Sequence, residues 1–329
     1  MLGDFFLDKY LDIEPELAET SIETGKRAHQ VKSTRCTPGA AGTVVNNLAA
    51  LDAGELHVLG FTGDDGEGYE LRRALRNLGC HVEGLLVVPE RLTPTYLKPR
   101  DCRTAALSGE HERYDTKNRT PTPGPVLDQV LSRLERILPK VDAVIVLDQV
   151  EEEECGIITS SVRRKACALG TCFPEKAFWA DSRFRIGLFR DVMIKINVAE
   201  AIKETSPDRV RATSEDAIVQ AISVLRARTG KPVFVTSGPA GIWISDPEPH
   251  LVRGVKVEEP TDPTGAGDSA TAGAVLSLCS GATPREAAIV ANLVASITVQ
   301  QLAMTGTARR DQLESRLEMW LDQGQGSRF

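Results

Sequence analysis

The chain lacks long apolar runs, and this shortage excludes a membrane protein. None of its stretches approaches the roughly 18 consecutive apolar residues that a membrane-spanning helix needs. No signal peptide begins the sequence. We therefore expect a cytoplasmic protein without a membrane partner.

An excess of positive charge is also missing. The net charge is −7 and the isoelectric point is near 5.4, with the basic residues scattered along the chain. Nucleic-acid-binding proteins carry a concentrated basic patch, so we expect no nucleic acid as a partner. A small molecule is the better expectation for a substrate.

Paired cysteines and a P-loop are absent as well. The seven cysteines form no Cys-x-x-Cys pair, and no histidine stands near them at metal-ligand spacing. They are expected to be reduced thiols that mostly fill space. No segment reads Gly-x4-Gly-Lys-Ser/Thr, so any phosphate site must be built from other residues.

What the sequence does contain is an alternation of helical and strand patterns. With 329 residues and 41% hydrophobic content it can form one large domain or two modest ones. Continuous apolar strands separated by amphipathic helices predict an α/β fold, with a doubly wound, mostly parallel sheet and helices on both faces. The expected elements are a helix over 126–138, a strand over 143–147, a helix over 157–169 and strands over 177–181, 192–197 and 232–236.

The most informative stretch runs from Asp262 to Asp268 and contains Gly265, Ala266 and Gly267. These small residues can turn tightly at a helix start, where free backbone N–H groups and the helix dipole attract an anion. Asp268 would repel a phosphate unless it has a separate role, such as general base toward a hydroxyl. Two alternatives are a helix start capped by Asp268 and a dinucleotide-type loop that continues to Ala270. The second is weak, because that loop belongs to the first βα turn of its fold.

This stretch resembles the C-terminal signature of the PfkB (ribokinase-like) family of carbohydrate kinases, and all seven positions match. The resemblance implies that the amides of Gly265, Ala266 and Gly267 bind the transferred phosphoryl group. It implies that Asp268 activates the acceptor hydroxyl, and that Thr264 lies on the nucleotide side. An ordinary aspartate has a pKa of roughly 4, so Asp268 is expected to be ionised at neutral pH.

Further motifs of the family follow in the expected order. The pair Asn197 and Glu200 ends a strand, and the resemblance implies that it arranges the nucleotide phosphates and Mg²⁺, with Glu200 acting through water. A helix cap is the alternative. The remaining residues implied to bind ATP are Thr236, Gly238, Gly241 and Asn292. A plain hairpin would also explain the two glycines, and a helix-face amide would explain Asn292.

The acceptor side follows the family pattern less closely. The resemblance implies that the acceptor is bound by Asp8, Gly39, Thr43 and Asn47. Thr43 stands where the family has asparagine, Ala40 replaces the second glycine of a hinge, and Asp52 replaces a glycine after the helix. Asn47 matches the heptose-7-phosphate kinase branch, which this chain resembles most.

Three structural expectations complete the resemblance. We expect a single domain over residues 1–329, with segments 11–37 and 92–118 forming a small β lid that could mediate a homodimer. The turn from Gly60 to Gly68 is expected to need small bulk and positive φ. Family members place a full buried strand before Gly3 and Asp4. It is nearly absent here, so we expect a true start upstream of Met1 or, less favoured, a clipped first strand.

The motifs together predict an enzyme that uses ATP and Mg²⁺ to phosphorylate a sugar or sugar phosphate, with a monovalent cation such as K⁺ as a further cofactor. Two alternatives stay open at this point. One is a nucleoside or other small-alcohol kinase of the same fold. The other is a regulator that binds a sugar or nucleotide without catalysis.

Overall fold

The computed structural model describes residues 1–104, 109–207, 214–302 and 305–324. Its central sheet has the order β1-β10-β11-β12-β13-β14-β15. The strands are β1 (Leu2–Gly3), β10 (Ala143–Asp148), β11 (Ala177–Ser182), β12 (Met193–Asn197), β13 (Val233–Thr236), β14 (Gly241–Ser245) and β15 (Pro249–Arg253). The first five run parallel, and the last two pair antiparallel. The predicted mostly parallel sheet is confirmed.

Helices cover both faces of this sheet, as the apolar strands require. Val144 and Val146 of β10 face one hydrophobic core, and Ile145 and Leu147 face the other. One core is closed by α1 (Ala41–Ala50), α2 (Gly66–Asn77), α7 (Ala266–Cys279), α8 (Pro284–Thr298) and α9 (Leu313–Asp322). The opposite core is closed by α3 (Gly124–Ile137), α4 (Ser160–Cys172), α5 (Val198–Thr205) and α6 (Glu215–Thr229). No helix in the described residues is long and apolar enough to cross a membrane.

The helix expected over 157–169 begins later than the sequence suggested. Thr159 is the N-cap of α4, and its side chain accepts a hydrogen bond from the Val162 amide. Ile157 is held outside the helix because its amide donates to the Asp4 carboxylate at 2.7 Å. A hydrogen bond to Asp4, near the N-terminus, therefore helps to set the start of α4.

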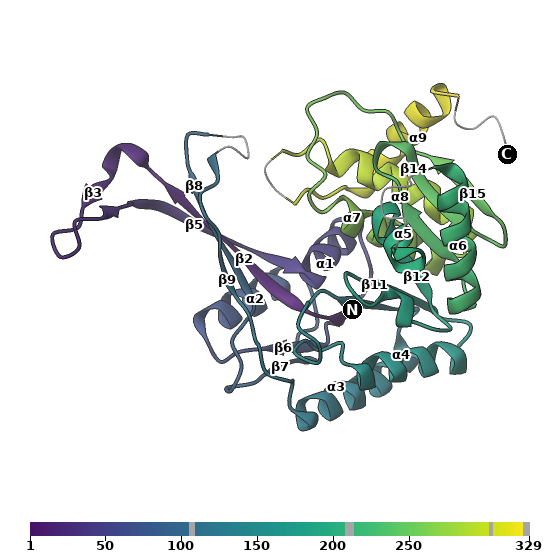
Figure 1. Cartoon of the computed structure of the whole chain (residues 1–329), viewed down its shortest axis with the longest axis horizontal. Coiled ribbons are helices and arrows are strands. Elements are labelled where there is room, and N and C mark those ends of the chain that lie inside the picture. Colours follow the sequence, from purple (N-terminus) through teal and green to yellow (C-terminus); the bar gives the residue numbers. More distant parts are fainter. Residues whose placement is uncertain (105–108, 208–213, 303–304, 325–329) are drawn as a thin grey trace.

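A second sheet leaves the body of the molecule as a long ribbon (Figure 1). Its order is β5-β2-β8-β9, with β2 (Phe5–Ile13) between β5 (Val31–Ala40) and β8 (Thr95–Asp101), and β9 (Tyr114–Thr116) at one edge. These strands contain parts of the two segments expected to form a lid, residues 11–13, 31–37, 95–101 and 114–116. A short hairpin of β3 (Glu19–Thr20) and β4 (Arg27–Ala28) lies at the tip of the ribbon. Only Asp4 separates β1 of the central sheet from β2 of the ribbon.

The Gly60 to Gly68 turn lies between β6 (Gly60–Thr62) and α2, and β6 pairs with β7 (Leu85–Val87). Its glycines do not adopt positive φ, so that expectation was wrong. Close packing explains Gly60, Gly63 and Gly68 instead, whereas a Cβ at Gly66 would meet nothing within 4 Å. A Cβ at Gly63 would lie 2.5 Å from the Arg91 carbonyl oxygen. Asp65 caps α2 by accepting from the Gly68 amide at 2.7 Å.

Two of the departures from the family pattern fall on backbone that favours glycine. Ala40 has φ 51° and ψ −117° at the start of α1, and Asp52 has φ 61° just after its end. An alanine with this backbone is strained by about 1–3 kcal/mol. Ala40 and Asp52 therefore keep backbone conformations that glycine would adopt with less strain.

Replacing Ala40 with glycine is expected to stabilise the fold. The strain energy relieved at position 40 exceeds the entropic cost of the flexibility that glycine adds to the unfolded chain, which is about 0.5–1 kcal/mol. We expect the free energy of unfolding in urea to rise by about 1 kcal/mol. The matched control is Ala49→Gly in the same helix, which should lower it by a similar amount. Equal destabilisation by both variants would contradict the strain at Ala40.

Candidate functional site

A cavity of about 650 Å³ opens where the parallel strands end at their carboxyl termini. It collects most residues that the sequence assigned to phosphoryl transfer and nucleotide binding. Those that line it are Asn197, Glu200, Thr236, Gly238, Gly241, Ala266, Gly267, Asp268 and Asn292. Segments that lie far apart in the sequence thus line the same cavity. Gly265 adjoins this cavity, and Thr264 is exposed beside it.

The start of α7 forms a tight turn at this cavity. Gly265 has φ 77°, a left-handed conformation that glycine accommodates. The Asp262 side chain holds the turn by accepting from the Thr264 amide at 2.9 Å. The Ala266 amide donates to the Pro263 carbonyl at 3.1 Å and is not free.

This finding corrects the expected donor set. Among the described residues, the amides of Gly265, Gly267 and Asp268 have no internal acceptor. Two of the three predicted amides are therefore available, together with the amide of Asp268 itself. They lie at the positive end of a 14-residue helix, which favours a phosphoryl group.

The Asp268 carboxyl group does not have an ordinary pKa. Burial raises its pKa to about 7, Lys195 opposes that rise, and the nearby Asp181 and Asp8 add to it. The expectation of an ordinary value was therefore wrong. A base with a pKa near neutrality is well matched to taking a proton from a hydroxyl at physiological pH.

The raised pKa predicts a pH profile. Activity that needs ionised Asp268 should fall as the pH drops through about 7, because the protonated carboxyl cannot accept a proton. At pH 6 we expect roughly a tenth of the plateau value of kcat/KM. The measurement is kcat/KM for ADP formation between pH 5.5 and pH 9. A profile that stays flat down to pH 5.5 would contradict the assignment.

Two charged residues at this site were missed by the sequence reasoning. Lys195 on β12 and Asp181 on β11 form an ion pair with an Nζ to Oδ2 distance of 2.6 Å. Both line the cavity beside Asp268. The available signal was a charged residue near the carboxyl end of each of two buried strands, where α/β folds collect ligand-binding groups.

Asn197 and Glu200 form a capping box at the start of α5. The Asn197 side chain accepts from the Glu200 amide at 2.9 Å, and the Glu200 carboxylate accepts from the Asn197 amide at 3.2 Å. Asn197 and Glu200 therefore do form the helix cap that was the alternative interpretation of this pair. Glu200 also faces the cavity, so a cap and a ligand-binding role are compatible.

The turn after β13 is a hairpin, as its glycines allowed. A Cβ at Gly241 would lie 2.2 Å from the Val252 carbonyl oxygen of β15, which explains the glycine. The Asn292 amide group donates to the carbonyls of Val252 at 2.9 Å and Arg253 at 3.3 Å. The Asn292 donors are therefore used to hold β15, although the residue lines the cavity.

The predicted acceptor residues lie on the ribbon side, outside the lining of the large cavity. Asp8 is buried on β2, 3.3 Å from the Lys98 ammonium, and a Cβ at Gly39 would lie 3.0 Å from the Asp8 carboxyl carbon. Thr43 is buried, and its methyl carbon lies 3.5 Å from the Cβ position of Gly265. Asn47 is fully buried and donates to the Thr43 carbonyl at 3.0 Å. Thr43 thus borders the turn at the start of α7, Asp8 acts electrostatically on the Asp268 carboxyl group, and Asn47 lies one helical turn beyond Thr43 in α1.

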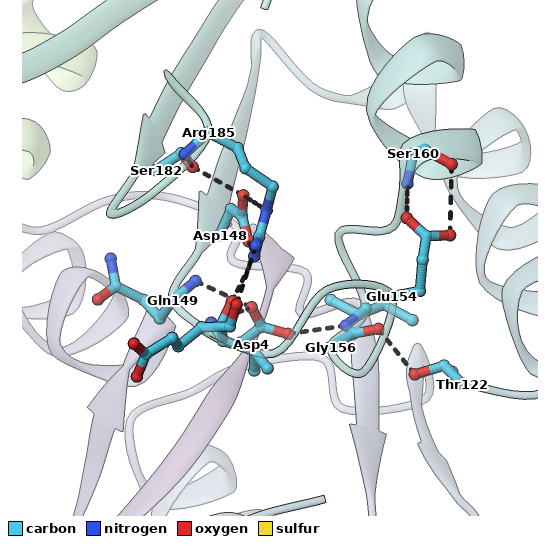
Figure 2. Close-up of polar contacts among 12 residues, drawn as sticks. Asp4, Thr122, Asp148, Gln149, Glu154, Gly156, Ser160, Ser182 and Arg185 are labelled. Atoms are coloured by element: carbon cyan, nitrogen blue, oxygen red, sulfur yellow. Dashed lines mark hydrogen bonds and ion pairs between the residues drawn. The ribbon is translucent and has the colours of Figure 1, made fainter. Parts of the chain in front are cut away.

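Asp4 fastens the loop that follows β10 (Figure 2). Its carboxylate accepts hydrogen bonds from the amides of Gln149, Val150 and Ile157 at 2.9, 3.2 and 2.7 Å. Beside it, the buried Asp148 carboxylate pairs with Arg185, at 2.8 Å. The loop is therefore fixed at the point where the two sheets meet. Its residue Gln149 also lines the large cavity.

One group of side chains in the described residues could hold a metal ion, and it lies elsewhere. Glu55, His57 and His81 have ligand atoms within 4.8 Å of one another. The two imidazole rings stack with an interplanar angle of 14°. They line a separate cavity of about 190 Å³ that shares no lining residue with the larger one. This group is not part of the candidate active site.

Comparison with known families and proteins supports the assignment made from the motifs. Residues 192–309 match the model of the pfkB family carbohydrate kinases. The bifunctional protein HldE of Desulfatibacillum aliphaticivorans is 28% identical over 323 residues, which are 97% of this chain and 62% of that protein. HldE of Caulobacter sp. (strain K31) is 29% identical, covering 95% of this chain and 61% of that protein. The chain thus spans about three fifths of the length of these curated relatives.

Solved structures share the fold. The ribokinase of Thermotoga maritima has a TM-score of 0.68 at 17% identity, covering 96% of this chain and 98% of that one. The Arabidopsis thaliana ribokinase, solved with ribose and ATP, has a TM-score of 0.68 at 17% identity, covering 96% and 97%. The chain is therefore related to the pfkB family of carbohydrate kinases and has the ribokinase-like fold, as its motifs predicted.

Proposed function

We propose that this chain is an ATP-dependent carbohydrate kinase, which transfers the γ-phosphoryl group of ATP to a hydroxyl of a sugar or sugar phosphate. The observation that carries the proposal is the place of Asp268. Its carboxyl group lies at the amide-lined start of α7, in a cavity that also contains the expected nucleotide residues.

Asp268 would act as the general base. The acceptor hydroxyl gives its proton to the carboxylate as its oxygen attacks the γ-phosphorus, and the bond from phosphorus to the bridging oxygen of ADP breaks. The free amides of Gly265, Gly267 and Asp268 stabilise charge on the transferred group, at about 3 kcal/mol for a well-placed donor. Positioning of the two substrates supplies much of the remaining acceleration.

Mg²⁺ is expected to accompany ATP, and the residues present fit it. Glu200 directs a carboxylate to the cavity, and only Oε2 is used in the capping box within the described residues. When bound, the ion would neutralise charge on the triphosphate. The protein's contribution is to hold the Glu200 side chain in place through Asn197. We include a monovalent cation such as K⁺ in the proposal, to be tested by activity in potassium and in choline salts.

The acceptor class is proposed from the resemblance to the heptose-7-phosphate kinase branch and from the relatives named HldE. Asp8 would bind acceptor hydroxyls, with Gly39 and Thr43 beside it and Asn47 supporting Thr43 from within α1. The altered hinge at Ala40 and Thr43 keeps a nucleoside or other small-alcohol acceptor as the second candidate. A panel of sugars, sugar phosphates and nucleosides, followed by ADP release, separates these classes.

The same panel tests for a binding protein without catalysis. Binding of a sugar in calorimetry without ADP formation for any acceptor would favour a regulator and overturn the kinase proposal. We further propose that the ribbon sheet closes over the acceptor and mediates a homodimer, to be tested by sedimentation. We propose the cytoplasm, where ATP is made and used, as the location, with no nucleic acid as a partner.

A further inference from the structure

The Lys195 side chain has a position that the general-base mechanism does not explain. It leaves β12 toward the start of α7 and is nearly buried, with 12% of its side chain exposed. Its Nζ lies 2.6 Å from Asp181 Oδ2. Burying an ammonium at the wall of this cavity costs free energy unless a carboxylate or a bound anion compensates its charge.

Gly267 shows where this ammonium points. The residue is helical and does not have positive φ, so its backbone does not require glycine. An added Cβ would lie 2.8 Å from Lys195 Nζ, which is the nearest atom outside the helix itself. The ammonium therefore occupies the space that any larger residue at position 267 would need. Gly267 of the signature therefore leaves room for a cation.

The surroundings keep Lys195 protonated. Burial alone would lower its pKa, but the carboxylates of Asp181, Asp268 and Glu200 raise it above its usual value. Arg183, also on the cavity wall, and Asp8, on the ribbon, are the other charged groups that act on Asp268. The ammonium is thus a fixed positive charge beside Asp181 and Gly267, close enough to act on the Asp268 carboxyl group.

We propose that Lys195 contacts the transferred phosphoryl group directly, as a fourth donor beside the amides of Gly265, Gly267 and Asp268, and that Asp181 is its positioning residue. The inference rests on the proposed kinase function and deepens it. A phosphoryl oxygen that accepts from the Gly267 amide lies next to the Lys195 ammonium. Lys195 keeps its protons throughout, since the hydroxyl proton goes to Asp268 and the electrons of the broken bond stay with ADP.

The first test replaces Lys195 with methionine, which keeps the length of the side chain but removes the charge. We expect kcat to fall by about 10²–10³-fold, the scale for loss of one preorganised donor. ATP affinity in calorimetry should fall at least about tenfold while ADP affinity stays within about threefold, because only ATP carries the γ-phosphoryl group. Lys165→Met on α4, which removes a surface ion pair with Glu135 on α3, is the matched control and should change neither value. Unchanged ATP affinity and kcat in Lys195→Met would overturn the proposal.

A second test uses Gly267. Its replacement by alanine should displace the ammonium and reproduce much of the Lys195→Met defect. In the double variant Lys195→Met with Gly267→Ala, the alanine should lower kcat by less than about a further threefold, because the ammonium that it displaces is already absent. Independent losses that multiply in the double variant would contradict the contact. Lys195→Met leaves Asp181 unpaired and could unfold the protein. In that case the combined variant Lys195→Met with Asp181→Asn, which removes both charges, replaces Lys195→Met in the comparison with Gly267→Ala.

A third readout is independent of turnover. Carbon-13 NMR of the aspartate carboxyl groups should show the Asp268 pKa rising above about 7 in Lys195→Met, because the opposing charge is lost. A purely structural lysine at a distance would leave that titration unchanged, and such a result would contradict the proposed placement. Absence of ADP formation by the wild type would instead count against the kinase proposal, while selective loss of ATP over ADP binding would still support the contact.

Discussion

Replacement of Asp268 with asparagine is expected to lower kcat by at least about 100-fold, the usual range of a general-base contribution. Asparagine fills the same space but cannot take the proton of the acceptor hydroxyl. The amides at the start of α7 and the nucleotide turn are unchanged, so ATP affinity in calorimetry should stay within about threefold. Asp311→Asn, on the surface beside Arg309, is the control and should retain full activity.

The same variant should be more stable than the wild type above neutral pH. The Asp268 pKa in the folded protein, about 7, exceeds the value of roughly 4 in an unfolded chain. Its stabilising contribution is therefore present below about pH 4 and is lost as the pH rises through 7. At pH 8 asparagine avoids this loss, and we expect a higher Tm. Lower stability of the variant at pH 8, or full activity, would contradict the role given to Asp268.

The second large effect is expected at Asp4. Asp4→Ala removes the acceptor of three backbone amides in the loop after β10 and leaves them without a partner (Figure 2). Each buried amide that loses its acceptor costs about 1–3 kcal/mol. We expect the free energy of unfolding in urea to fall by about 3 kcal/mol or more.

Two controls separate this effect from a general loss of charge. Asp4→Asn keeps one carbonyl oxygen as an acceptor and should lose less than the alanine variant. Asp12→Ala, on the adjoining strand β2, removes an exposed pair with Arg35 and should cost no more than about 1 kcal/mol. A loss at Asp4→Ala equal to that at Asp12→Ala would show that the loop does not depend on this carboxylate.

Much of the fold could be predicted from the sequence, because local pattern and global architecture agree. Apolar strands such as 143–147 alternate with amphipathic helices, and this periodicity specifies a buried parallel sheet. The stretch from Asp262 to Asp268 predicted the start of α7 and two of its free amides, those of Gly265 and Gly267. The place of Asn197 and Glu200 at the carboxyl end of a strand predicted that they would lie where α/β folds collect ligand-binding groups, and both line the cavity.

What could not be predicted depends on contacts between distant segments. The hydrogen bond between Asp4 and Ile157 joins residues 153 positions apart in the sequence, and it holds Ile157 outside α4. The raised pKa of Asp268 is a consequence of burial, which no local pattern encodes. Lys195 was overlooked because a lysine in a strand is usually solvated, and only the packed structure pairs it with Asp181. The turn that uses the Ala266 amide was equally invisible in the sequence.

The most direct test of the central claim is the rate of acceptor-dependent ADP formation by the wild type and by Asp268→Asn at pH 8, with the best acceptor from the panel. Our account predicts that ADP forms only when the sugar is present, that the phosphorylated sugar accumulates in equal amount, and that the variant is at least about 100-fold slower. Equal rates for the two proteins, or sugar binding without any phosphorylated product, would contradict it.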